Sequence, residues 1–313
     1  MTKKEWQVCL QNKGFGDCWP EIERELQQEL VITSVIQKRD DIPVGNNKRG
    51  GEPDLPEFID WPIYQLRGVS GTHNTSKPMT FLMQLRCDVL KPFATSTPFP
   101  ETGLVSFFLA VDQGHLVRNE YDMPLFRVLY TSHSSNALVR TKFPKGLYHL
   151  NKLAPGTIRL EQSFGIDFDL LSSIIDEKFG FSQEQHEKLL QWHEQELCDF
   201  ESHKIFGFPA SKEIDVFDEC RLLTDRIADY KQRKQETPLP ALNHDDWILL
   251  LKYELDEPGD LVREEAGRLY FMIRRSDLAA CRFDESVVIH EDETRDFACL
   301  IKNGSATKFM GKK

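Results

Sequence analysis

The chain has 313 residues, of which 40% are hydrophobic and 28% charged, and this length can bury a large core without a disulfide or a metal. The composition excludes collagen-like, coiled-coil and wholly disordered proteins. Lys and Arg number 39 against 50 Asp and Glu, a net charge of −11, so no nucleic-acid partner is expected, because phosphate binding needs a surplus of cations.

The N-terminal residues, Met1–Leu10, lack the apolar run of a secretory signal. A helix is predicted to open at Pro20, where a first-turn proline costs no hydrogen bond. Its apolar face is Ile22, Leu26 and Leu30. The β-branched run Leu30–Gln37 predicts a strand. The Gly- and Pro-punctuated segment Asp40–Pro78 predicts a long loop, of a kind that is usually functional or mobile.

Short apolar runs bounded by Gly and Pro predict further strands on both sides of a helical region. They are Met79–Leu85, Gly103–Val111, Arg127–Thr131 and Thr157–Leu160 before it, and Trp247–Leu255, Gly267–Ile273 and Val287–His290 after it. A capping box of Ser182 and Gln185 predicts a helix to about Ser202, and apolar spacing predicts another over Asp218–Gln235. His203–Pro209 is expected to end the first of these helices.

One pattern occurs twice: a short apolar strand, a variable connection, a Gly and an aromatic strand. The first copy is Phe81–Leu85 with Gly103–Leu109, and the second is Leu249–Tyr253 with Gly267–Ile273. The repetition predicts an internal duplication. We therefore expect a single α+β domain over residues 1–313, with a mostly antiparallel or mixed sheet built from the duplicated strand unit. Its first half is expected at about 30–160, a few inserted helices at about 165–236 and the second half at about 245–300.

The cysteines and the lengths of the apolar runs predict the compartment. Seven scattered cysteines without a Cys-x-x-Cys pair are expected to be reduced thiols. They are Cys9, Cys18, Cys87, Cys198, Cys220, Cys281 and Cys299. No run approaches the roughly 18 apolar residues of a membrane helix. A cytoplasmic location without a membrane partner is therefore expected.

No catalytic or metal signature is complete. Gly45–Gly51 has the glycine spacing of a phosphate loop, but Gly51 and Glu52 stand where Lys and Ser or Thr are required. His186 and His193 share a helix face within an apolar stripe, which favours packing over a metal pair. No metal and no cofactor is therefore expected. Acid–base use of paired carboxylates stays open, because their separation is a tertiary property.

A series of motifs runs from a Gly-rich loop to the C-terminal strands. They are Gly50–Pro56, Trp61-Pro62, Pro78–Leu85, Gly103 with Phe107-Phe108, His203–Pro209, and Trp247–Leu251 with Gly267–Phe271. In order and spacing the series resembles the YwqG-like family, a bacterial domain of unknown function. The resemblance implies an α+β fold and supports the duplication, but it brings no reaction, cofactor or catalytic residue. Lys252 stands where the family pattern tends to have Gln, and Arg263–Glu265 replaces a Trp-Gly-Asp-like turn.

The candidate ligand-binding residues are Gly50, Gly51, Pro53, Asp54, Trp61, Gln84 and His203. The glycines allow positive φ angles and the prolines stiffen the chain, so this loop is expected to be preorganised. Trp61 either lines a pocket or is buried as part of a cap on the sheet. Gln84 is an amide inside an apolar strand and must find partners if it is buried. It either holds the Gly-rich loop to the sheet or faces a ligand.

The lack of a complete catalytic signature favours a non-catalytic cytoplasmic protein that recognises a protein or a small ligand, because a stiff aromatic loop loses little entropy on binding. One alternative is a hydrolase or transferase that uses carboxylates and a histidine such as His203. Another is an acidic, immunity-like partner of a basic protein, as the net charge of −11 suggests. Whether the chain is an enzyme stays open at this level.

Overall fold

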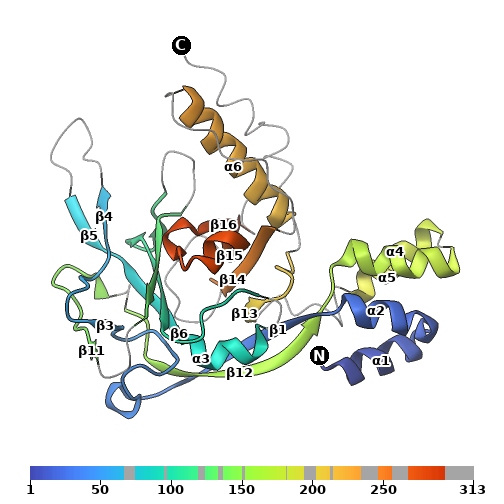
Figure 1. Ribbon diagram of the computed structural model, residues 1–313, viewed down its shortest axis with the longest axis horizontal. Coiled ribbons are helices and arrows are strands. Elements are labelled where there is room, and N and C mark those ends of the chain that lie inside the picture. The colour runs from blue at the N-terminus through green and yellow to red at the C-terminus, as the bar shows by residue number, and fades with distance from the viewer. Residues whose placement is uncertain are drawn as a thin grey trace.

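The computed structural model describes residues 1–66, 75–94, 97–118, 124–132, 137–149, 152–180, 182–193, 202–211, 214–233, 246–255 and 267–292. Ten strands of this part form one antiparallel sheet that curls into a nearly closed barrel (Figure 1). In spatial order they are β10 (Phe126–Thr131), β7 (Leu104–Leu109), β6 (Thr80–Arg86), β2 (Lys48–Arg49), β12 (Gly156–Gly165), β1 (Gln27–Ile36), β13 (His203–Phe206), β14 (Trp247–Glu254), β15 (Gly267–Arg274) and β16 (Val287–Asp292). The predicted α+β class is confirmed.

Shorter elements surround the sheet. Three strand pairs are β3 (Asp54–Pro56) with β11 (Leu138–Arg140), β4 (Ile63–Leu66) with β5 (Thr75–Pro78), and β8 (Val111–Asp112) with β9 (His115–Leu116). The helices are α1 (Lys3–Asn12), α2 (Trp19–Glu25), α3 (Cys87–Leu90), α4 (Phe168–Phe179), α5 (Gln183–Trp192), α6 (Val216–Arg233) and α7 (Arg275–Ala279).

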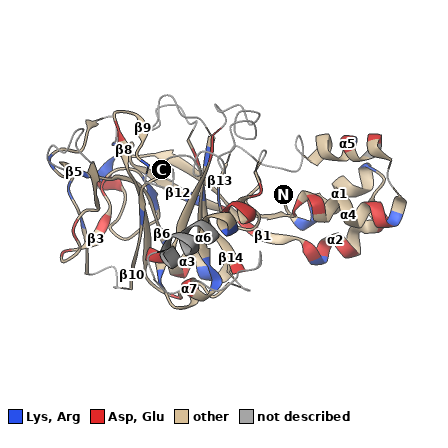
Figure 2. Cartoon of the chain, turned by 90° about the horizontal axis from the view of Figure 1, so that it is seen from above, with Lys and Arg blue, Asp and Glu red and all other residues tan. Residues whose placement is uncertain are grey.

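Helices α1, α2, α4 and α5 form a separate layer to one side of the sheet (Figure 2). Helix α1 begins at a capping box of Thr2 and Glu5, and α4 begins at Asp167, whose carboxylate accepts from the Leu170 N–H, and ends at Gly180. The shared core of these helices is Trp6, Leu10, Cys18, Ile22, Leu26, Ile166, Leu171, Ile175, Leu189 and Trp192. Two segments far apart in the sequence therefore build one helical layer.

Several predicted boundaries are wrong. Helix α2 ends before Leu26, which is extended (φ −60°, ψ 118°), so Leu30 belongs to β1 and not to the helix. The segment Asp40–Pro78 contains β2 to β5 and is no plain loop. His203–Pro209 contributes β13 to the middle of the sheet, inside the region expected to be helical. Of the helix predicted from Ser182 to about Ser202, the structure describes α5, and residues 194–201 lie outside the described part.

The main apolar core fills the inside of the curl. Phe107 of β7 and Phe271 of β15 are in contact there, although these strands are far apart in the order of the sheet. On the outer face, the first half is covered by a cluster that includes Trp61 and Phe108, and the second half by a cluster between α6 and the sheet that includes Trp247. Both faces are therefore buried, which explains why β6, β7, β14 and β15 read as continuous apolar runs.

The two halves of the sheet pair in the same register. Gln84 of β6 lies opposite Lys48 and Ser106, while Lys252 of β14 lies opposite Lys204 and Tyr270. The β6–β7 and β14–β15 pairs each contain one register shift. It lies between Phe81 and Met83 in the first half and between Leu249 and Leu251 in the second, directly before the central polar residues Gln84 and Lys252. The strand order is correspondingly symmetrical about the pair of β12 and β1 at the centre.

Candidate functional site

The chain bends sharply directly after β2, at two glycines. Gly50 and Gly51 have φ angles of +61° and +68°, a region that residues with side chains seldom adopt. A side chain on Gly50 would also lie 2.4 Å from the carbonyl oxygen of Ala154. Glycine is therefore required at this position for two independent reasons, and the bend turns the following residues, Pro53 and Asp54, over the outer face of the sheet.

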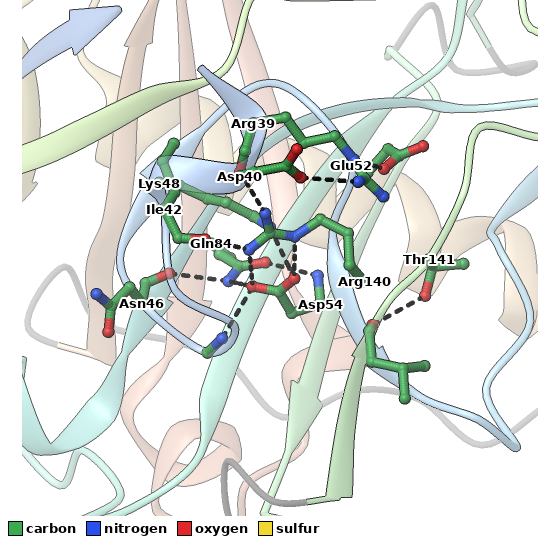
Figure 3. Close-up of polar contacts among 12 residues, drawn as sticks. Arg39, Asp40, Ile42, Asn46, Lys48, Glu52, Asp54, Gln84, Arg140 and Thr141 are labelled. Carbon is green, nitrogen blue, oxygen red and sulfur yellow. Dashed lines mark hydrogen bonds and ion pairs between the residues drawn. The ribbon is translucent and has the colours of Figure 1, made fainter. Parts of the chain in front are cut away.

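Asp54 lies at the centre of a buried polar cluster on that face (Figure 3). Its side chain is fully buried. It accepts hydrogen bonds from the Gly45 N–H (2.9 Å), Gln84 Nε2 (2.7 Å) and Arg140 Nε (2.7 Å), and Lys48 Nζ lies 2.9 Å away. We call Lys48, Asp54, Gln84 and Arg140 the Asp54 cluster. Its contacts with Gln84 and Arg140 join Asp54 to segments that are distant in the sequence.

Gln84 holds the Gly-rich loop to the sheet, as one of its two predicted roles requires. Its Oε1 accepts from the main-chain N–H of Asp54 (2.9 Å), and its Nε2 donates to the Asn46 carbonyl (2.8 Å) as well as to the Asp54 carboxylate. The amide therefore joins β6 to Asp54 in the loop and to Asn46 before β2.

Burial and charge act in opposite directions on the cluster. Burial alone would raise the pKa of Asp54, but the hydrogen bond from Arg140 and the charge of Lys48 bring it below its ordinary value. Burial lowers the pKa of Lys48 to about 8, against the attraction of Asp54. The carboxylate is thus held ionised and surrounded by donors.

Arg140 extends the cluster to the surface. It donates to the carbonyls of Arg39 (2.7 Å) and Ile42 (2.8 Å), which fixes the segment before β2 against β11. Glu52 in turn pairs with the Arg39 guanidinium and accepts from the Phe143 N–H (3.3 Å). The whole segment between β1 and β3 is therefore held by side chains from several directions.

Trp61 lies apart from the Asp54 cluster. Its indole is 9% exposed, donates to the Met79 carbonyl (2.8 Å) and contacts the rings of Phe108 and Phe143, with centroids 5.9 and 6.0 Å away. The side chain is therefore part of the apolar layer on the outer face of the first half of the sheet.

His203 lies in the other half of the sheet, at the start of β13. Its Nδ1 accepts from the main-chain N–H of Glu254 (2.9 Å), and its ring stacks on Tyr253 at 4.5 Å between centroids. The Tyr253 hydroxyl accepts from Arg49 of β2 across the inside of the curl (3.1 Å). Because Nδ1 is an acceptor, the proton of the neutral ring is assigned to Nε2.

Asn47 accepts a main-chain hydrogen bond in the first half that corresponds to the one His203 accepts in the second. Each residue directly precedes the lysine that faces the central polar residue of the neighbouring strand. Asn47 Oδ1 accepts from the Arg86 N–H at 2.7 Å, just as His203 Nδ1 accepts from the Glu254 N–H. Both side chains therefore cap the strand beside them at equivalent positions.

A second cluster of buried charges, which the sequence did not predict, lies on the outer face of the second half. Glu254 lies 3.0 Å from Lys252 Nζ and 3.2 Å from Arg268 Nε, and Arg268 and Tyr270 also contact Glu291 at 3.3 and 2.6 Å. Beside them, Lys204 pairs with Glu29 at 3.1 Å. The available signal was Lys252, a charged residue in an otherwise apolar strand, at the register position that Gln84 has in the first half.

The helical layer holds the two histidines considered as metal ligands. His186 Nδ1 lies 3.0 Å from the Ser172 hydroxyl, and both His186 and His193 pack on the ring of Phe168. Burial lowers the pKa of His193 to about 4. Within the described ranges, no three His, Cys, Asp or Glu side chains group as a metal site would need. In the same part of the chain, no helix has the length and apolar character needed to cross a bilayer.

Comparison with known proteins identifies a domain. Residues 47–291 match a family described as "Domain of unknown function (DUF1963)". The matched range comprises 245 residues (291 − 47 + 1) of 313, and it contains the Asp54 cluster, Trp61 and His203. No curated protein matches the chain.

Proposed function

The chain belongs to the DUF1963 family, and from that premise we propose that it is a non-catalytic binding protein of the cytoplasm whose partner is another protein. The family description fits a bacterial domain of unknown function and assigns no reaction, so the proposal depends on the residues of the chain itself. The observation that carries it is a contrast: the polar groups considered for chemistry are occupied in holding strands together, while apolar side chains lie exposed on the same segments.

The polar groups favour a structural role. A general acid or base must exchange a proton with a substrate within hydrogen-bond reach. Asp54 is fully buried, accepts hydrogen bonds from three residues and lies beside the Lys48 ammonium, and His203 Nδ1 is occupied by a main-chain N–H. These contacts argue against acid–base use of either residue.

Exposed apolar side chains on the segments around the Gly-rich loop favour a protein partner. They are Val35, Ile36, Val44, Phe58, Ile63 and Val139, which we call the apolar loop surface. The two most exposed are Ile36 at 76% and Phe58 at 71%. Interaction sites are typically built from apolar side chains that stay exposed to water.

The Asp54 cluster supports this surface from below. Arg140 follows Val139 in β11 and donates to the carbonyl of Ile42, so Val139 and Val44 lie on segments that are joined directly. Phe58 follows β3, which pairs with β11. A surface held in this way has little conformational freedom left to lose on binding, which favours affinity.

Affinity capture with matched variants tests the proposal. Wild type, Phe58→Asp and Val8→Asp are immobilised, incubated with lysate of the source cells and compared by quantitative mass spectrometry. Val8 is a suitable control because it is an apolar residue 47% exposed on the helical layer, away from the apolar loop surface. Proteins retained by wild type and Val8→Asp are expected to fall at least about tenfold on Phe58→Asp. Equal capture by all three chains would contradict the proposal.

A thermal-shift screen separates a protein partner from a small ligand. A molecule that binds only the folded chain raises its Tm by mass action. Metals, nucleotides, sugars and amino acids are expected to leave the Tm unchanged. A shift of several degrees with any of them would replace the protein partner by a small ligand of that class.

We further infer that the two halves arose by internal duplication, and that the chain is a member of the YwqG-like family that its motifs resemble. Matched backbone angles support the duplication: Phe206 and Gly207 have φ angles of +62° and +68°, against +61° and +68° at Gly50 and Gly51. A proline also follows each lysine by five positions in both halves, at 53 and 209. Separate profiles of the two halves, built from relatives, are expected to align in this register, and alignment in another register would contradict the duplication.

A further inference from the structure

A tryptophan and an arginine meet where β14 begins and β15 ends, and both side chains are hydrogen-bond donors. We propose that Trp247 and Arg274 bind a small oxyanion, such as sulfate or phosphate, at the ends of these strands and beside helix α6. The site belongs to the second half of the sheet, and the inference does not depend on the binding function proposed above.

Trp247 has a fixed place between the sheet and α6. It is the first residue of β14 and lies opposite Arg274, the last residue of β15. Its side chain is 5% exposed and belongs to the apolar cluster that includes Val216, Cys220 and Leu223 of α6. The indole is therefore enclosed by apolar side chains on the helix side, and its partner across the sheet is a cation.

The indole nitrogen of Trp247 is a buried donor. In the described part of the chain, no acceptor lies within hydrogen-bond distance of its Nε1. Two other buried tryptophans do have acceptors, since Trp6 donates to the Phe164 carbonyl at 2.7 Å and Trp61 to the Met79 carbonyl at 2.8 Å. Because an indole can only donate and buried donors are nearly always paired, Trp247 calls for an acceptor from outside the chain.

Arg274 adds a positive charge at the same place. Its guanidinium carbon lies 5.4 Å from the centroid of the Trp247 ring. Within the described ranges its side chain forms no ion pair, and its one hydrogen bond is a long one, 3.5 Å to Thr224 Oγ1. Arg268 of the same strand, in contrast, pairs with two buried carboxylates at 3.2 and 3.3 Å. The half-buried guanidinium of Arg274 therefore keeps donors for a ligand.

The two donors together select the charge of the ligand. A cation would be repelled by Arg274, and a water molecule could accept from the indole but would not compensate the charge of the guanidinium. The guanidinium presents its N–H groups as a fork that matches two oxygens of an oxyanion, which leaves a further oxygen for the Trp247 N–H. The hydroxyl of Thr224 adds no donor, because it already donates to the Cys220 carbonyl at 2.9 Å.

The burial of the indole limits the size of the ligand. A nucleotide or an amino acid carries an organic group that would have to displace the apolar side chains of α6 around Trp247. An inorganic ion carries none. Sulfate and phosphate are therefore expected to bind, although the larger molecules of the ligand screen described above are not.

The indole N–H signals of the ¹⁵N-labelled full chain report on this site directly. The chain has five tryptophans, and Trp247→Phe identifies the relevant signal because it keeps an aromatic ring but removes the donor. Sodium sulfate and sodium phosphate are titrated in separate series, with sodium chloride at matched ionic strength as the control. The Trp247 signal is expected to shift to a plateau with sulfate, phosphate or both, and to respond to chloride far less.

Matched arginine variants test the second donor. Arg274→Gln is expected to raise the Kd from the titration at least about tenfold, because a charge-assisted hydrogen bond is lost. Arg159→Gln, at an exposed arginine of β12, should leave the Kd unchanged. Sulfate and phosphate stabilise folded proteins in general, so the indole signal and not the Tm is the deciding measurement.

The titration of wild type decides even if Trp247→Phe does not fold, since one indole signal alone has to respond and its response has to weaken in Arg274→Gln. A shift without a plateau, or an equal shift with chloride, would mean an adventitious ion only and would overturn the proposal. It would also be overturned by an indole signal that no oxyanion moves, or by an unchanged Kd in Arg274→Gln.

Discussion

The rings of Phe107 and Phe271 meet edge to face inside the curled sheet, with centroids 5.3 Å apart and planes at 75°. The two residues occupy equivalent positions in the two halves, since Phe107 lies opposite Met83 and Phe271 lies opposite Leu251, each directly after the register shift. The strands that carry them are far apart in the sheet and meet only because it curls. This contact therefore marks the place where the halves share one core.

A double-mutant cycle on this pair measures how strongly the halves are coupled. Phe107→Leu and Phe271→Leu should each lower the free energy of unfolding, and the double variant should lose about 1 kcal/mol less than the sum, because the ring contact is lost only once. Urea unfolding gives the values. Phe107→Leu combined with Ile22→Val in the helical layer should be additive; equal coupling for both pairs would contradict a specific ring contact.

Replacing His203 by asparagine should be better tolerated than replacing it by alanine. Asparagine at the equivalent position, Asn47, accepts the corresponding main-chain N–H, whereas alanine leaves the Glu254 N–H buried without an acceptor, at a cost of about 1–3 kcal/mol. Chemical denaturation of His203→Asn and His203→Ala compares them. Equal losses would mean that the ring stacking on Tyr253, and not the hydrogen bond, gives His203 its role.

Gly50→Ala should be far more destabilising than Gly14→Ala. Both glycines have positive φ angles, +61° and +86°, so both substitutions strain the backbone by about 1–2 kcal/mol. Only at Gly50 would the new side chain meet the Ala154 carbonyl, since nothing lies within 4 Å at Gly14. Thermal unfolding of the two variants tests this expectation. Similar Tm values would contradict it and would show that the loop moves to accommodate a side chain at position 50.

Asp54→Asn should cost about 3–5 kcal/mol, because Lys48 and Arg140 would be left without their buried counter-charge. The pKa of Asp54 is lowered in the folded state, so its contribution is complete above the ordinary value of 3.8 and disappears as the pH falls towards the lower folded value. The gap in unfolding free energy between wild type and variant should therefore narrow below about pH 4. Asp40→Asn, at a side chain 88% exposed, should change stability by less than about 1 kcal/mol at any pH.

The unfolding free energy of wild type should rise with pH above about pH 8, and Lys252→Gln should remove this rise. Burial lowers the pKa of Lys252 to about 8 from an ordinary value of 10.5. Between these values the unfolded chain binds more protons than the folded one, so wild type gains stability as the pH rises. Subtracting the variant's unfolding free energy isolates this term from the other titrating groups. A difference that stays constant from pH 8 to pH 10 would contradict the lowered pKa of Lys252.

Strands buried on both faces were predictable because their apolar runs are continuous. Short strands were not: β2 contains only Lys48 and Arg49, and β13 includes Lys204, and these lysines are tolerated in the sheet only because Asp54 and Glu29 reach them from distant segments. Helices α1 and α4, in contrast, carry readable caps and could have been predicted from Thr2 and Glu5 and from Asp167 and Gly180.

The candidate site was likewise predictable from the sequence only in part. The role of Gln84 could be predicted because an amide in an apolar strand has few options. The separation of His203 from the Asp54 cluster could not, since it depends on which half of the sheet β13 joins. The contacts of Glu254 with Arg268, and of Glu291 with Arg268 and Tyr270, required knowledge of register, because these residues are neighbours only across β14, β15 and β16.

The position of β1 determines which recombinant fragments of this protein are expected to fold. This strand ends before residue 47, where the matched family region begins, yet it pairs with β12 on one side and with β13 on the other. A recombinant fragment trimmed to the family region would contain two half-sheets with no common neighbour, and would expose the surfaces of Leu171 and Trp192 that α1 and α2 cover. Such a fragment is expected to aggregate, whereas one that keeps residues 1–46 retains the strand through which both halves are connected.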